Sequence, residues 1–130
     1  MNIILLLYMD INNSIDLCII NNNHYDISLV VFKILKYKYR YQKNNIWEYL
    51  DKNNNWVQDI KHKNMIYSIK TDVYKHFIKR AIEWNDNSVL NNNYNINNNI
   101  ISDKLLFLSL KLKNNKYISS IIKESQQFFI

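Results

Sequence analysis

The stretch DISLVVFKILKYKYRY, residues 26–41, contains the change of hydrophobic period on which the predicted fold depends. Asp26 is well placed as a helix N-cap, and apolar residues from 27 to 35 follow the spacing of one buried helical face. These residues are Ile27, Val30, Val31, Ile34 and Leu35. From 36 to 41, cations alternate with tyrosines, a period of two that is typical of a strand. The stretch therefore predicts a helix followed directly by a strand.

Two further short strands are predicted downstream, at residues 46–50 and 56–58, with polar turns before each. Connections this short favour an antiparallel three-stranded meander. Trp47, Tyr49 and Trp56 are interpreted as structural aromatic residues that pack the meander against helices, because large rings in small sheets usually fill such a layer. The alternative for Trp47 and Trp56 is a pair of rings that stack on nucleic-acid bases.

Helical periodicity returns after the meander. Apolar residues in steps of three and four from Ile66 to Trp84 predict one long amphipathic helix, capped at Asn64 or restarted after a kink at Thr71-Asp72. Leucines from 105 to 112 fit a buried helix that Ser102 caps, although their alternation also allows a strand. A last helix is predicted from 116 to 129, with a core face of Ile118, Ile121, Ile122, Ser125 and Phe129. The predicted fold class is α+β, mostly helical, with helices around a small antiparallel meander.

The length of 130 residues fits one small domain. Residues 1–23 are interpreted as a poorly defined leader or linker, because asparagines bracket a short apolar stretch at 15–20 that we expect to be a strand or loosely attached. Residues 24–130 are interpreted as the domain. The Asn-dominated segment 85–99 within it is expected to be a flexible surface loop.

The composition lacks Gly and Pro and is rich in Asn, Ile, Lys and Tyr, which we interpret as codon bias towards A and T. Asn is then expected to replace Gly in left-handed turns. The net charge of +6 suits an anionic partner, nucleic acid first, although codon bias alone could account for it. Cys18 is the only cysteine, which fits a reducing, intracellular compartment. The apolar segment 3–8 is too short to span a bilayer and lacks the basic flank of a signal peptide, so neither secretion nor membrane insertion is expected.

The sequence offers little for catalysis. A Walker A loop needs Gly so that backbone N–H groups can approach phosphate, and the chain has none. His24, His62 and His76 lack metal-ligand spacing, and nothing aligns a Ser/His/Asp set. We therefore predict no enzymatic activity, no metal and no cofactor.

One basic cluster is a candidate nucleic-acid site, and no acidic residue interrupts it. Its cations are Lys33, Lys36, Lys38, Arg40 and Lys43. Cations on one strand face can contact phosphates, and aromatic rings can stack on bases. The alternative is that Tyr37, Tyr39 and Tyr41 face the core while the cations are merely solvated, and the period of two favours this for the tyrosines. A second basic set on the long helix, Lys70, Lys75, Lys79 and Arg80, is interpreted as solvated surface.

The order of these motifs resembles a known family. HYDIS at 24–28 precedes YKYRY at 37–41, WEYLD at 47–51 and then Trp56, while the segment 113–128 carries Tyr117, Ile121 and Glu124. This order is similar to the segment before the motor in poxvirus-type primase–helicases of nucleocytoplasmic large DNA viruses, which have phage and plasmid relatives. The resemblance covers about residues 24–130. Ser28 stands where the family pattern has Ala, and Glu48-Tyr49-Leu50 replaces its aromatic pairing.

The resemblance implies a non-catalytic module of a viral DNA-replication primase–helicase, as a fragment or a stand-alone piece without the helicase motor. The implied partners are primase and helicase domains or subunits and single-stranded DNA, and the implied location is the virus factory in the host cytoplasm. The alternative is a protein-interaction domain or degraded paralogue that docks a replication partner without binding nucleic acid. A small enzyme of unknown chemistry is the third hypothesis.

Overall fold

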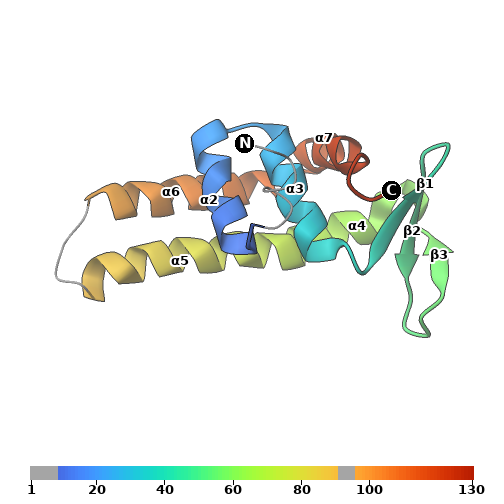
Figure 1. Cartoon of the computed structure of the whole chain (residues 1–130), viewed down its shortest axis with the longest axis horizontal. Coiled ribbons are helices and arrows are strands. Elements are labelled where there is room, and N and C mark those ends of the chain that lie inside the picture. The colour runs from blue at the N-terminus through green and yellow to red at the C-terminus, as the bar shows by residue number, and fades with distance from the viewer. Residues whose placement is uncertain (1–8, 91–95) are drawn as a thin grey trace.

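The computed structural model describes residues 9–90 and 96–130, and it has the predicted α+β, mostly helical architecture. Helices α5 and α6 lie side by side along the long axis, α2 and α3 cross them, and the sheet lies at the other end from the C-terminus of α5 (Figure 1). The elements are α2 (Ile11–Asn21), α3 (His24–Leu35), β1 (Tyr39–Gln42), β2 (Ile46–Leu50), β3 (Trp56–Gln58), η1 (Ile60–His62), α4 (Lys63–Ser68), the π-helical η2 (Ile69–Val73), α5 (Tyr74–Leu90), α6 (Ile96–Lys111) and α7 (Asn115–Ser125).

Helix α3 begins three residues earlier than predicted. Asn23 is its N-cap and accepts a hydrogen bond from the backbone N–H of Asp26 at 2.9 Å, so Asp26 lies inside the first turn. The predicted apolar face is buried except for the partly exposed Ile34. Ser28 is also buried, and its hydroxyl donates to the carbonyl oxygen of His24 at 2.7 Å and lies 3.2 Å from that of Ile121. A small side chain at this position lets α7 pack closely against α3.

The three-stranded antiparallel meander is confirmed, in the order β1-β2-β3. Tyr39 pairs with Tyr49, and Tyr41 pairs with Trp47, so these four rings share the face towards the helices. Trp47 is 1% exposed, and its ring centroid lies 5.2 Å from that of Phe129. Tyr39 is buried beside α4, and burial raises its pKa to about 12 despite the 2.6 Å hydrogen bond between its hydroxyl and that of Ser68.

Trp56 differs from the prediction because it lies on the opposite face of the sheet. It pairs with Leu50, which is an odd number of residues from Trp47 along β2. It is partly exposed, and it does not pack the meander against the helices as Trp47 does. Tyr49 is partly buried against the core.

The long helical run after the meander is confirmed, with Ile69, Val73, Phe77 and Ala81 buried. Its N-terminus is not capped by Asn64. Instead the buried carboxylate of Asp59 accepts hydrogen bonds at 2.9 Å from the backbone N–H groups of Asn64 and Met65. At Thr71-Asp72, where a kink was the alternative, the structure has the wider π-helical turn η2, which keeps the run continuous.

The prediction of a loose leader is wrong for residues 10–21. Asp10 caps α2 by accepting a hydrogen bond from Asn13 N–H at 2.7 Å, and both Ile15 and Cys18 are fully buried in the core. Asp16 then ties α2 to α5. Its carboxylate lies 2.7 and 3.0 Å from two guanidinium nitrogens of Arg80, and it accepts a 2.9 Å hydrogen bond from the indole N–H of Trp84.

The prediction of a loop over 85–99 is also wrong in part. Helix α5 continues to Leu90 and α6 begins at Ile96, so only 91–95 lie outside the described residues. Ser102 lies inside α6 and donates to the carbonyl oxygen of Ala81 at 2.8 Å, which ties the two helices together instead of capping one. Leu105, Leu108 and Leu112 are the buried leucines of this stretch, and their helical spacing excludes the strand alternative.

Two further expectations concern the left-handed turns and the last helix. Asn22, Asn44, Asn45 and Asn54 have positive φ angles between 47° and 68°, as expected of Asn in left-handed turns, and Lys61 and His62 also have positive φ. Helix α7 starts at Asn115 and ends at Ser125, before the predicted end at 129. Its predicted core residues are nevertheless all buried, because Phe129 folds back in the segment that follows the helix.

Replacing Trp47 tests whether this ring holds the meander on the helices. Trp47→Ala should lower the free energy of unfolding by roughly 3–5 kcal/mol, because it leaves a cavity in a packed core. Trp47→Phe should cost much less, since the indole N–H has no hydrogen-bond partner among the described residues. Trp56→Ala is the matched control and should cost roughly 1 kcal/mol, the scale of one exposed cation–π contact. Equal losses for the two alanine variants in urea denaturation would contradict the assigned faces.

A second prediction concerns the attachment of α2. Asp16→Ala removes the acceptor for Arg80 and Trp84, and it should cost about 2 kcal/mol, the scale of hydrogen bonds to a charged group. Asp86→Ala removes the same charge from an exposed position on α5 and is the control. Both are compared by urea denaturation. If the two midpoints coincide, α2 is not held by this contact.

Candidate nucleic-acid interface

The candidate site is a cleft of about 510 Å³ beside the three-stranded sheet. It forms where the C-terminus of α3 and the turn after it meet β1, β3 and the segment that follows α7. Six of its nine lining residues are aromatic, and two are cationic. The lining comprises Phe32, Lys36, Tyr37, Tyr39, Arg40, Trp56, Phe128, Phe129 and Ile130.

The cleft depends on a contact between distant parts of the chain. The backbone N–H of Tyr41 donates to the carbonyl oxygen of Phe129 at 3.1 Å, so the segment after α7 covers the free edge of β1. The ring of Phe129 packs edge-on against Phe32 on α3, with centroids 5.2 Å apart. The contribution of Phe128 and Phe129 to this cleft was not predicted, because no local sequence pattern shows which strand edge the segment after α7 covers.

One aromatic ring of this surface, Tyr37, is exposed, and a second, Trp56, is partly exposed. Tyr37 is 79% exposed, because Lys36 to Lys38 form a turn after α3 and not the start of a strand. The prediction that Tyr37 faces the core is therefore wrong, whereas Tyr39 is buried and Tyr41 is partly buried. Trp56 presents its ring on the outer face of the sheet. Exposed ring faces of this kind can stack on unpaired bases.

Two of the predicted cations, Lys36 and Lys38, lie beside tyrosine rings at this end of the molecule, but only Lys36 lines the cleft. The ammonium nitrogen of Lys36 is 5.0 Å from the centroid of the Tyr37 ring, and that of Lys38 is 5.9 Å from the centroid of the Tyr39 ring. Both side chains are exposed, and neither is paired with an acidic side chain in the described part of the chain. Their charges therefore remain available to an anionic ligand.

Arg40 also lines the cleft, but an acidic neighbour compensates much of its charge. It is the cross-strand partner of Glu48, and its Nε lies 2.8 Å from a carboxylate oxygen of that residue. The hydrogen bond from Arg40 holds the pKa of Glu48 below its usual value. The guanidinium carbon lies 4.3 Å from the centroid of the Trp56 ring. Arg40 therefore orients this ring more than it offers a free charge.

Lys33 does not belong to the site, contrary to the prediction. Its ammonium group donates to the carbonyl oxygen of Met9 at 2.7 Å and to the hydroxyl of Ser14 at 2.6 Å. Burial lowers its pKa. The side chain attaches the start of α2 to α3 and cannot reach a ligand in the cleft. Lys43 is exposed in the turn between β1 and β2 and does not line the cleft.

Local charge balance favours an anion at this end of the molecule. Residues 36–63 contain seven Lys or Arg and three Asp or Glu. Each acid is engaged: Glu48 with Arg40, Asp59 in capping α4, and Asp51 in accepting backbone hydrogen bonds from its own turn. Most of the cations have no such partner, so the potential here is positive.

The described residues contain neither a metal-binding cluster nor an exposed thiol. Among them, no group of three or more His, Cys, Asp or Glu side chains could hold a metal ion. Cys18 is buried, and burial raises the pKa of its thiol, with smaller contributions from Asp26 and Asp16, so it is a poor nucleophile. No helix in the described ranges is long and apolar enough to cross a bilayer.

Comparison with known proteins adds no relative: no family model, no curated protein and no solved structure matches this chain.

Proposed function

We propose that this chain is a non-catalytic module that contacts single-stranded nucleic acid through the cleft beside β1. The observation that carries this proposal is the exposed Tyr37 ring, which lines a mostly aromatic cleft and has the exposed cations Lys36 and Lys38 as its neighbours in the chain. A single strand needs ring faces for its bases and cations for its phosphates, and this surface has both.

The same surface suits a single strand better than a duplex. Bases within a duplex are stacked on one another, and their faces are not accessible to protein side chains. The accessible rings of Tyr37 and Trp56 would gain little from a duplex, whereas unpaired bases can stack on them. The expected contact is to phosphate and ring face, so it depends weakly on sequence and strongly on salt.

The biological setting that we propose is the replication machinery of a large DNA virus. The segment that supplies the cations and rings, YKYRY at 37–41, belongs to the motif order that resembles poxvirus-type primase–helicases. On this proposal the module positions a helicase motor, its partners are primase and helicase domains or subunits, and it acts in the virus factory of the host cytoplasm. The lack of Gly, and with it of a phosphate-binding loop, supports a non-enzymatic role.

The alternative function, docking of a protein partner without nucleic-acid binding, is favoured by a different surface. Helix α6 exposes several large apolar side chains. This helix contributes no residue to the cleft beside β1, so the two surfaces are separate.

Charge reversal at the cleft tests the proposed function. Lys36→Glu/Lys38→Glu should weaken binding of a labelled oligothymidine roughly tenfold or more at low salt, because two phosphate contacts are lost. The slope of log affinity against log salt should fall by about 1.4, at about 0.7 per contact for single strands. Fluorescence anisotropy across a salt series measures both quantities.

The matched control is Lys75→Glu/Lys79→Glu, which makes the same charge change on the exposed surface of α5. It should alter affinity much less. Tyr37→Ala tests stacking separately and should cost about 1–3 kcal/mol of binding energy without changing the salt slope. Equal losses for the two charge reversals would reduce the effect to net charge, and failure of the unmodified chain to bind at low salt would refute the proposal.

A further inference from the structure

Helix α6 is buried on one side and exposes several large apolar side chains on the other. Leu105, Leu108 and Leu112 pack into the core, yet Phe107 is 64% exposed and Leu110 is 65% exposed. Ile100 and Leu106 are also exposed on the same helix. Clustered large apolar side chains on a surface commonly mark an interaction site.

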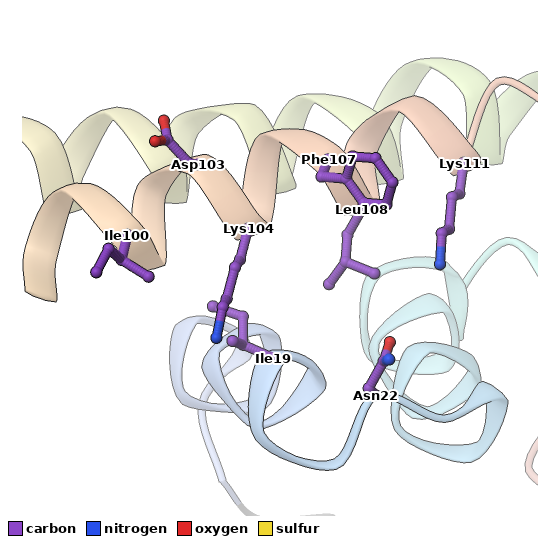
Figure 2. Close-up of a pocket in the computed structure, with 8 residues that line it drawn as sticks. All are labelled: Ile19, Asn22, Ile100, Asp103, Lys104, Phe107, Leu108 and Lys111. Atoms are coloured by element: carbon purple, nitrogen blue, oxygen red, sulfur yellow. The ribbon is translucent and has the colours of Figure 1, made fainter.

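A groove lies beside this exposed stripe. Its volume is about 420 Å³, and it is bounded by the C-terminal end of α2, with Ile19 and Asn22, and by α6. In Figure 2, the side chain of Lys104 points from α6 towards Ile19 on α2, and that of Lys111 points towards the helix after Asn22. Asp103 also lines the groove, but its carboxylate points away from α2. The groove therefore combines four apolar side chains, from Ile19, Ile100, Phe107 and Leu108, with two cations and one carboxylate.

The groove continues past Phe107 into a second hollow. This one has a volume of about 440 Å³ and is lined by Leu110, Asn114 and Tyr117 as well as by Phe107 and Lys111. Because Phe107 and Lys111 line both hollows, the two form one surface along α6. From Ile100 to Lys111 this surface is about 17 Å long, or about three helical turns. That length suits a helix with anchors at i, i+3 or i+4, and i+7.

The charges on the flank specify the partner further. Neither Lys104 nor Lys111 forms an ion pair with an acidic side chain within the described ranges. The ammonium nitrogen of Lys111 lies 5.5 Å from the ring centroid of Phe107 and 5.8 Å from that of Tyr117, so it stays at the groove. An occupant with carboxylates on the facing flank would satisfy both cations.

A second copy of the chain fits this surface poorly. If two α6 helices packed antiparallel about a two-fold axis, equivalent flanks would face each other, as equivalent flanking positions do in an antiparallel coiled coil. The flank with Lys104 and Lys111 would then oppose itself, and like charges would repel. The net charge of +6 on each copy adds to this repulsion.

We propose that the α6 groove binds an amphipathic helix of another protein, apolar along one stripe and acidic along the flank that faces Lys104 and Lys111. The site shares no residue with the cleft beside β1. Loss of one activity therefore leaves the other intact.

The test uses the full chain and two labelled synthetic helical peptides. Both carry the same leucine stripe, and the flanking positions are Glu in one and Lys in the other. Fluorescence anisotropy should show binding of the Glu-flanked peptide and at least tenfold weaker binding of the Lys-flanked peptide. Lys104→Glu/Lys111→Glu should reverse this preference, and Phe107→Ser should weaken the Glu-flanked peptide at least tenfold. Lys75→Glu/Lys79→Glu is the charge-matched control and should leave the preference unchanged.

Several outcomes would overturn the proposal. These are equal affinity for the two peptides, no binding of either peptide, and a preference that persists after the charge reversal at Lys104 and Lys111. Sedimentation of the unmodified chain as a dimer that Phe107→Ser converts to a monomer would assign the groove to a second copy. If the peptide binds only after residues 1–8 are removed, the groove would be assigned to that segment of the chain.

Discussion

The burial of α3 is the constraint on which the rest of the structure depends. This helix is apolar around most of its circumference, and such a helix is stable only when other elements cover it. Helices α2 and α7 and the π-helical segment η2 all pack against it. Ser28 leaves room for α7, and Lys33 holds the start of α2 through Met9 and Ser14. Because α3 ends in the turn that carries Tyr37, its position also decides where the candidate site lies.

Both proposed surfaces depend on which lysines are bonded within the protein and which remain without an acidic partner. The chain has 17 Lys or Arg residues, and their contacts differ from one to the next. Lys33 is used internally, and Lys113 donates to the carbonyl oxygen of Lys70 at 2.7 Å. Lys36, Lys38, Lys104 and Lys111 instead stand beside rings or apolar side chains without a paired acid in the described part of the chain. Uncompensated charge next to apolar surface is the combination that a ligand can use.

The π-helical turn shows how the long helix joins the sheet end to the α5–α6 pair. A wider turn at residues 69–73 shifts the register of side chains without breaking the helix. Ile69 and Val73 on this turn remain buried, and the run continues into α5 with Phe77 and Ala81 in the core. The sheet and helix α6 therefore pack on one hydrophobic core, although the cleft and the α6 groove are separate surfaces.

Sequence alone determined the features that arise between residues close in the chain. The apolar spacing of α3, of α5 and of α7 identified their buried faces, and short polar turns identified the meander, because these patterns reflect a helical repeat or a tight reversal. The preference of Asn for left-handed turns was likewise predictable from its side chain, since it tolerates positive φ better than other residues that have a Cβ.

Only the tertiary structure decided which distant segments meet. The role of α2 depends on Asp16 finding Arg80, which lies 64 residues away, and the cleft depends on Phe129 covering β1. Trp47 and Trp56 look equivalent in sequence, but strand register places them on opposite faces. Lys33 and Lys36 belong to one basic run, yet one is buried and the other is exposed. Such outcomes depend on how whole helices and strands pack against one another, and the spacing of neighbouring residues does not predict that packing.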